Sequence, residues 1–127
     1  MVTGLYAGLC GILLVVLYVR VSQRRLAIGI GLGAGGDTVL EQRIRAHGNF
    51  IETVPLALIL LYLFERSAAD PMHVHVLGAL LVVARLGHAQ GLSSTAGRSV
   101  GRLYGSVATV GIIAVLSLAL LAQAIRA

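Results

Sequence analysis

The segment Glu41–Pro55 places charged and amide side chains inside an otherwise apolar stretch of the chain. Four of them, Glu41, Arg45, Asn49 and Glu52, are spaced so that a helix would project all of them from one side. Ionisable groups at membrane depth are costly unless they are paired or face water. This stripe therefore predicts a binding site for a polar ligand.

The rest of the chain indicates a membrane protein that must shield these groups. Hydrophobic residues make up 57% of the 127 residues and charged residues only 12%, far from the balance of a soluble domain. Met1–Val19 and Leu103–Ile125 carry no charge, and each is long enough to cross a hydrocarbon core of roughly 30 Å. We predict a single all-α domain over residues 1–127, an integral membrane four-helix bundle. Its helices are expected at about residues 3–25, 38–65, 71–92 and 98–126.

The first two predicted helices are joined by the Gly-rich stretch Gly29–Asp37. It formally contains G-x-G-x-x-G at positions 31, 33 and 36, but that motif binds nucleotides only between a strand and a helix. The pattern here offers no strand, so we interpret the stretch as a flexible connector. After it, Thr38 and Glu41 have the spacing of a capping box that should start the second helix.

Thiol and metal chemistry have little support in the sequence. Cys10 is the sole cysteine and lies in the first apolar run, where a small apolar filler is expected rather than a nucleophile. His73 and His75 lack the further ligands that a metal site would need, so no metal is expected.

The ten basic residues are all arginines and are distributed unevenly between the predicted helix ends. Eight stand at the ends joined by the first and third connections: Arg20, Arg24, Arg25, Arg43, Arg45, Arg85, Arg98 and Arg102. The positive-inside rule then places those connections in the cytoplasm and both termini outside. The net charge of +5 therefore reflects orientation rather than nucleic-acid binding. In a bacterium this is an inner (plasma) membrane protein with its site near the cytoplasmic face.

Folding the four helices back on one another brings further polar groups to the depth of the stripe. Arg85 and His88 share one face of the third predicted helix, and Arg98 and Ser99 open the fourth. A bilayer cannot solvate these groups, so helices of one chain or of several must screen them. Four helices of this size can hardly enclose so many charges, so we expect an oligomer with sites at subunit boundaries.

These motifs resemble the MAPEG family, the membrane-associated proteins in eicosanoid and glutathione metabolism. Arg45-Ala-His47-Gly-Asn49-Phe-Ile-Glu52-Thr-Val-Pro55 is similar to the family's R-A-H-x-N-x-x-E-x-x-P signature in the second helix. Arg85-Leu-Gly-His88 resembles the R-x-x-H of the third helix, and Arg98-Ser99 resembles the R-S pair that opens the fourth. The helix layout agrees as well, so the resemblance spans nearly the whole chain. The connector and the small size look most like the family's uncharacterised bacterial inner-membrane branch.

The resemblance implies a homotrimer that binds glutathione between neighbouring subunits. It also implies a glutathione transferase or peroxidase acting on lipophilic electrophiles that arrive from the membrane lipids. By motif position, the residues that would hold the polar parts of glutathione are Arg45, Asn49, Glu52, Arg85 and His88. Guanidinium forks suit its carboxylates, and the Glu52 carboxylate suits its ammonium group.

The same resemblance gives Arg98 and Ser99 the catalytic role of acting on the glutathione sulfur. Cationic and hydrogen-bonding groups stabilise a thiolate and so activate it. The dipole of the helix that these residues open adds to that effect.

Two positions depart from the family pattern. Gly48 stands where the eicosanoid enzymes usually have a basic residue, and Leu92 stands where they carry a tyrosine. Tyr104, on the fourth helix, is a candidate substitute for that tyrosine. The cluster of Arg20, Arg24 and Arg25 resembles a basic group of which one member can touch glutathione, and the sequence does not single out which.

Other functions remain open at this point. A non-catalytic lipid- or ligand-binding protein on the same fold fits the missing tyrosine. A small drug or proton exporter would need an acid in its first helix, and Met1–Val19 has none. The polar residues could also serve only to hold the helices together.

Overall fold

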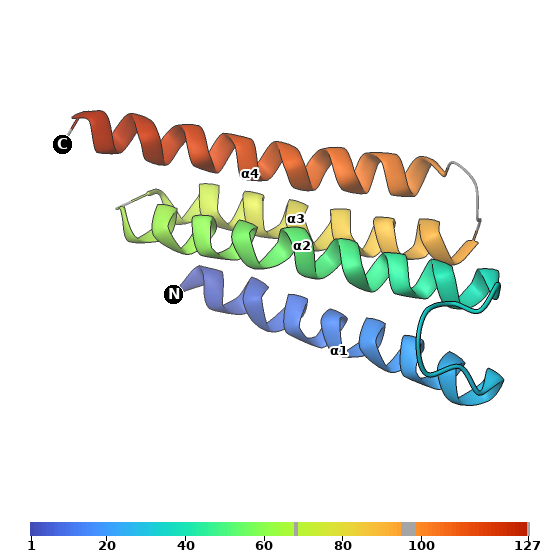
Figure 1. The fold of residues 1–127 in the computed structure, drawn as a ribbon. Coiled ribbons are helices and arrows are strands. Elements are labelled where there is room, and N and C mark those ends of the chain that lie inside the picture. The colour runs from blue at the N-terminus through green and yellow to red at the C-terminus, as the bar shows by residue number, and fades with distance from the viewer. Residues whose placement is uncertain (68, 95–98, 127) are drawn as a thin grey trace.

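Four long antiparallel helices make up the described part of the chain (Figure 1). The computed structural model describes residues 1–67, 69–94 and 99–126. Its helices are α1 (Val2–Ile28), α2 (Thr38–Arg66), α3 (Pro71–Ser94) and α4 (Val100–Arg126). Each is long and apolar enough to cross a membrane. The predicted all-α fold with membrane-length helices is therefore confirmed over these residues.

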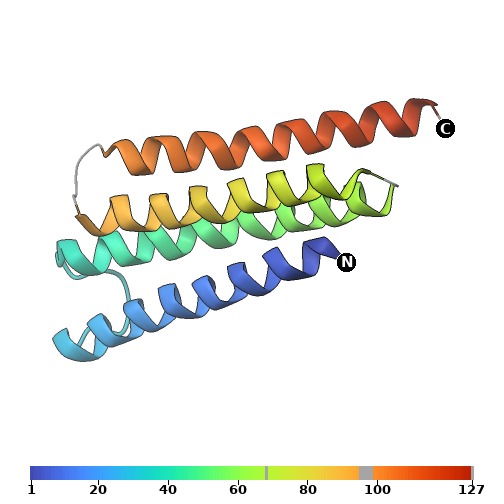
Figure 2. The same ribbon diagram turned by 180° about the vertical axis from the view of Figure 1, so that it is seen from behind.

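The helices α2 and α3 form the middle of the bundle, and α1 and α4 lie on opposite sides of this pair (Figures 1 and 2). Both chain ends lie at one end of the bundle, and α2 and α4 start at the other. Apolar side chains from all four helices form the core, among them Cys10, Leu17, Phe50, Val54, Leu61, Leu81, Ile112 and Leu116. Cys10 is 2% exposed, as an apolar filler would be.

Glycines bring α3 and α4 into backbone contact near the start of α4. A Cβ atom placed on Gly105 would lie 2.5 Å from the carbonyl oxygen of Ala84 and 2.7 Å from the Cβ of His88. A Cβ on Gly101 would lie 2.7 Å from the carbonyl oxygen of Gly87. Small residues allow such close approach of membrane helices. This contact sets the position of α4 beside the polar end of α3.

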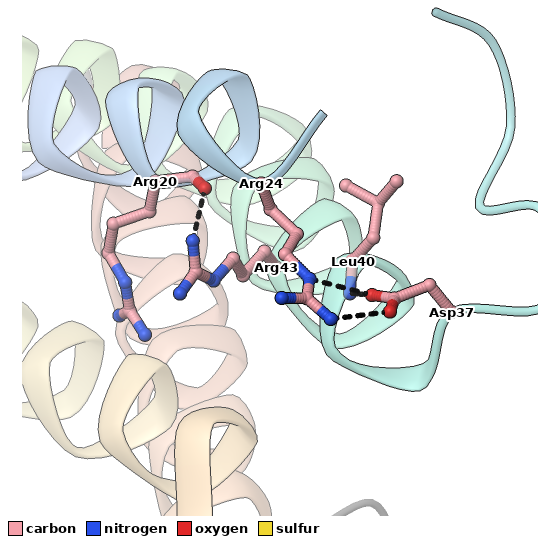
Figure 3. A network of polar contacts seen from close by, with 5 residues as sticks. All are labelled: Arg20, Arg24, Asp37, Leu40 and Arg43. Atoms are coloured by element: carbon pink, nitrogen blue, oxygen red, sulfur yellow. Dashed lines mark hydrogen bonds and ion pairs between the residues drawn. The ribbon is translucent and has the colours of Figure 1, made fainter. Parts of the chain in front are cut away.

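The helix α2 starts at the predicted residue, Thr38, but its cap differs from the sequence prediction. Its N-cap is Asp37, whose Oδ1 accepts a hydrogen bond of 2.6 Å from the backbone N–H of Leu40. The prediction that Thr38 and Glu41 form the capping box was therefore wrong. The physical reason is Arg24, which donates from Nε to Oδ1 at 3.1 Å and from Nη2 to Oδ2 at 2.6 Å (Figure 3). This fork holds a carboxylate at the helix N-terminus, where negative charge is stabilised.

The Gly-rich connector is bound at several points. Gly29 adopts a left-handed conformation with φ of 70° and ends α1, which is the usual place for glycine. Arg25 donates from Nη1 to the carbonyl oxygen of Gly33 at 2.9 Å. Nearby, Arg43 donates from Nη1 to the carbonyl oxygen of Arg20 at 2.6 Å, which joins α2 to α1 (Figure 3). Arg24 and Arg25 of α1 thus fasten a segment that its composition predicted to be flexible.

We expect the Arg24–Asp37 contact to make folding stability depend on pH in the acid range. The Arg24 fork and then the Leu40 N–H hold the pKa of the Asp37 carboxyl below its usual value of 3.8. Because the pKa of Asp37 is lower in the folded protein, its ionised carboxyl contributes fully to folding stability at any pH above the usual pKa. That contribution is lost as the pH falls through the lowered pKa. Thermal unfolding in detergent should show Asp37→Asn to be less stable than wild type at neutral pH, with a difference that shrinks in acid.

Glu41→Gln, an exposed change in the first turn of α2, is the control. A difference that stays constant down to low pH would contradict this role.

Candidate functional site

A cavity of about 890 Å³ lies between α2, α3 and α4, toward the end of the bundle opposite the two termini. The residues that line it are Ile44, Arg45, Gly48, Asn49, Glu52, His88, Ser99, Val100, Arg102, Leu103 and Ser106. Three helices thus contribute to one space, and most of its polar groups belong to the motifs singled out in the sequence.

The α2 side of the cavity is the polar stripe predicted from the sequence. Arg45, Asn49 and Glu52 all line it, because steps of four and three residues stay on one helix face. Arg45 and Glu52 are seven residues apart, which is about 10 Å along a helix. The wall therefore offers a cation and an anion at opposite ends with an amide between them. Glu41 is exposed and lies outside the lining set.

Asn49 carries an unused acceptor at this wall. Its side-chain Oδ1 is buried and has no hydrogen-bond partner among the described residues. Its backbone carbonyl is already used, since Thr53 Oγ1 donates to it at 2.8 Å. A buried acceptor without a donor costs about 1–3 kcal/mol. A ligand N–H group that reached this atom would remove that cost.

The two residues of α3 that were predicted to bind the ligand, Arg85 and His88, lie in different surroundings. His88 is nearly buried and lines the cavity, whereas Arg85 lies one turn away, inside the bundle, and is 1% exposed. Arg85 Nη2 is 3.3 Å from His88 Nδ1, and Arg85 Nη1 donates to Thr109 Oγ1 at 3.5 Å. The guanidinium also lies over the ring of Phe50, 5.6 Å from its centre. The structure therefore places Arg85 behind His88 rather than in the cavity wall.

Ser99 caps α4. The helix begins at Val100, and Ser99 Oγ accepts a hydrogen bond of 3.2 Å from the backbone N–H of Arg102. A serine hydroxyl that accepts in this way still has its own hydrogen to donate, so Ser99 can also bind a ligand in the cavity. The predicted catalytic partner Arg98 lies outside the described residues.

Two polar lining residues of α4 were not among the predicted site residues. Arg102 and Ser106 line the cavity together with Ser99. Arg102 is three residues after Ser99, and Ser106 is four residues after Arg102, so all three lie on one face of a helix. This spacing is the feature of the sequence that could have identified them. Arg102 adds a second cation to the cavity wall, opposite the stripe of α2.

The cavity wall does not include the tyrosine suggested as a substitute, Tyr104, or the basic cluster of α1. Tyr104 is 69% exposed on α4 and is not part of the cavity wall. In the cluster, Arg24 binds Asp37 and Arg25 binds connector carbonyls. Within this single chain, α1 supplies no lining residue to the cavity.

Comparisons with known proteins test the family resemblance. The sequence model of the MAPEG family matches residues 3–122. The chain is 36% identical over 91 residues to the inner membrane protein YecN of Escherichia coli K12, an alignment that covers 72% of this chain and 70% of that relative. YecN of E. coli O6:H1 strain CFT073 matches to the same extent, and no solved structure matches significantly. Because the family match covers nearly the whole chain, the predicted resemblance is confirmed, and this protein belongs to the MAPEG family.

Proposed function

We propose that this chain is an inner-membrane protein that binds glutathione and uses it as a transferase or peroxidase on lipophilic electrophiles. The observation that carries the proposal is the α2 wall of the cavity, where Arg45, the unused acceptor of Asn49 and Glu52 follow one another. Glutathione is a tripeptide with two carboxylates, one ammonium group and a thiol. Arg45 suits a carboxylate, Asn49 Oδ1 a peptide or ammonium N–H, and Glu52 the ammonium group.

The size of the cavity is compatible with this ligand. Small-molecule pockets measure roughly 300–1,000 Å³, and this cavity is near the upper end at about 890 Å³. The apolar residues Val100 and Leu103 are 72% and 63% exposed on the side of α4 that lines the cavity. A lipophilic electrophile would reach the site along that apolar side.

The start of α4 is the proposed catalytic element. Bound glutathione would supply its thiol, which would lose its proton to water. The sulfur would then bond to an electrophilic carbon while the leaving group departs with its electron pair. Ser99 would donate its hydroxyl hydrogen to the sulfur, and Arg98, the preceding residue, would add positive charge. The N-terminus of α4 favours negative charge at the same point.

We further propose a homotrimer in which neighbouring subunits complete the site. Arg45 and Glu52 are exposed in the single chain although they belong to a membrane-length helix. Lipid cannot solvate them, so a second copy of the chain that covers this face would remove the cost. The relatives are named as inner membrane proteins, and the positive-inside rule puts the site near the cytoplasmic face, where the arginines gather.

Calorimetric titration of the detergent-purified protein with glutathione tests the binding proposal. We expect saturable binding, and we expect free cysteine to bind much more weakly because it lacks the second carboxylate and the peptide groups. An absence of any response at millimolar glutathione would refute the proposal. Native mass spectrometry of the same sample should give the mass of three chains.

A second candidate is a binding protein on the same fold that carries out no chemistry. It is favoured by Tyr104, which is exposed on α4 rather than placed in the cavity. Conjugation of glutathione to a reactive aryl halide separates the candidates, because a binding protein would bind glutathione without forming the conjugate. Arg98→Ala tests the proposed charge beside the sulfur.

Variants of Ser99 separate its capping role from its proposed catalytic role. Ser99→Ala should lower the free energy of unfolding by about 1 kcal/mol, because the cap of α4 is lost. Ser99→Asp keeps an acceptor for the N–H of Arg102, so its stability should stay close to that of wild type. Neither variant has a neutral hydroxyl to donate, so conjugation should fall in both. Full activity of Ser99→Ala would exclude the catalytic role.

A further inference from the structure

Arg85 is a buried cation fixed in place by three helices. Thr109 of α4 accepts from Nη1 at 3.5 Å, and the ring of Phe50 from α2 lies under the guanidinium. The Thr109 hydroxyl hydrogen is already donated to the carbonyl oxygen of Gly105, at 2.8 Å. Thr109 can therefore only accept from Arg85. The hydrogen-bond chain thus has one direction, from Arg85 through Thr109 to the backbone of α4.

The same guanidinium constrains the imidazole of His88. A guanidinium has donors only, so the nitrogen of His88 that lies 3.3 Å from Nη2, Nδ1, must accept. In a neutral imidazole with its lone pair on Nδ1, the proton sits on Nε2. A fully protonated ring would instead set an N–H against the guanidinium. The contact is therefore compatible with one protonation form of His88.

We infer that Arg85 is a positioning residue that holds His88 as the neutral tautomer protonated on Nε2. His88 lines the cavity and Arg85 lies behind it, so the cavity receives an N–H donor rather than a basic nitrogen. The identity of the recipient rests on the proposed function: the donor would bind an oxygen of glutathione. His88 then binds the ligand and does not take a proton from the thiol.

Nuclear magnetic resonance of protein labelled with 15N-histidine tests the inference directly. The chemical shift of each ring nitrogen shows whether it carries a proton, and His88→Gln identifies the His88 signals. In wild type we expect an unprotonated Nδ1 and a protonated Nε2. Arg85→Lys keeps a donor and should keep this form, whereas Arg85→Met should lose the preference for it. A wild-type spectrum with the proton on Nδ1 would overturn the inference, whether or not the Arg85 variants fold.

Titration with glutathione gives the second readout. His88→Leu and Arg85→Met should each weaken binding by about tenfold, the worth of one hydrogen bond. His88→Gln retains an N–H donor and should weaken binding less than His88→Leu does. Equal losses in the two His88 variants would overturn the donor role. If wild type shows the expected tautomer, Arg85→Met loses the preference for it, and wild type binds no glutathione, the positioning role of Arg85 is supported and the proposed function fails.

Discussion

Replacement of Arg45 by leucine is expected to weaken glutathione binding by about a hundredfold. In the proposed trimer a neighbouring subunit covers Arg45, and breaking a hydrogen-bonded charge pair in such a shielded site costs about 2–5 kcal/mol. About 2.7 kcal/mol corresponds to a factor of a hundred. Arg45 is the cation at one end of the α2 wall, and leucine keeps much of its apolar bulk while removing all of its donors. Calorimetric titration of the variant with glutathione in detergent measures the loss.

The matched control is Arg66→Leu. Arg66 is also an exposed arginine of α2, in the last turn of the helix and far from the cavity. Its replacement changes the net charge of the protein by the same amount. Affinity should therefore stay close to that of wild type. Similar losses in the two variants would mean that overall charge, and not the cavity wall, attracts glutathione.

Replacement of Gly105 by alanine is expected to destabilise the bundle, although alanine is the better helix former. The new Cβ would lie 2.5 Å from the carbonyl oxygen of Ala84, so α4 must move away from α3. Such overpacking costs about 1–3 kcal/mol. The same Cβ would press on His88, so glutathione affinity should fall together with stability. Thermal unfolding and titration of the same preparation measure both effects.

Gly111→Ala is the control on the same helix. A Cβ at Gly111 meets no atom of the described chain within 4 Å. The change therefore keeps the helix-propensity gain of alanine, up to about 1 kcal/mol, without the clash. Its unfolding temperature should equal or exceed that of wild type. A Gly105→Ala protein as stable as the Gly111→Ala protein would show that α3 and α4 do not pack as closely as described.

Local spacing was enough to predict the parts of the site that belong to one helix. Arg45, Asn49 and Glu52 line the cavity because a single helix keeps them on one face, whatever surrounds it. Arg85 and His88 obey the same rule, yet only His88 reaches the cavity wall. Their separation depends on how α3 is rotated against Phe50 and Thr109, which lie far away in the sequence. The spacing of two residues carries no information about that rotation.

The sequence by itself determined the number of membrane-length helices, their antiparallel order, the polar stripe and the family. The first three features follow from apolar length, charge distribution and helical period, and the family follows from the resemblance of short motifs; all of these are local. The tertiary structure alone decided that Asp37 caps α2 and that Arg85 stands behind His88. Each of these depends on contacts between helices, such as the fork from Arg24 and the close approach at Gly105. Such contacts depend on the relative rotation and height of two helices, which no single segment encodes.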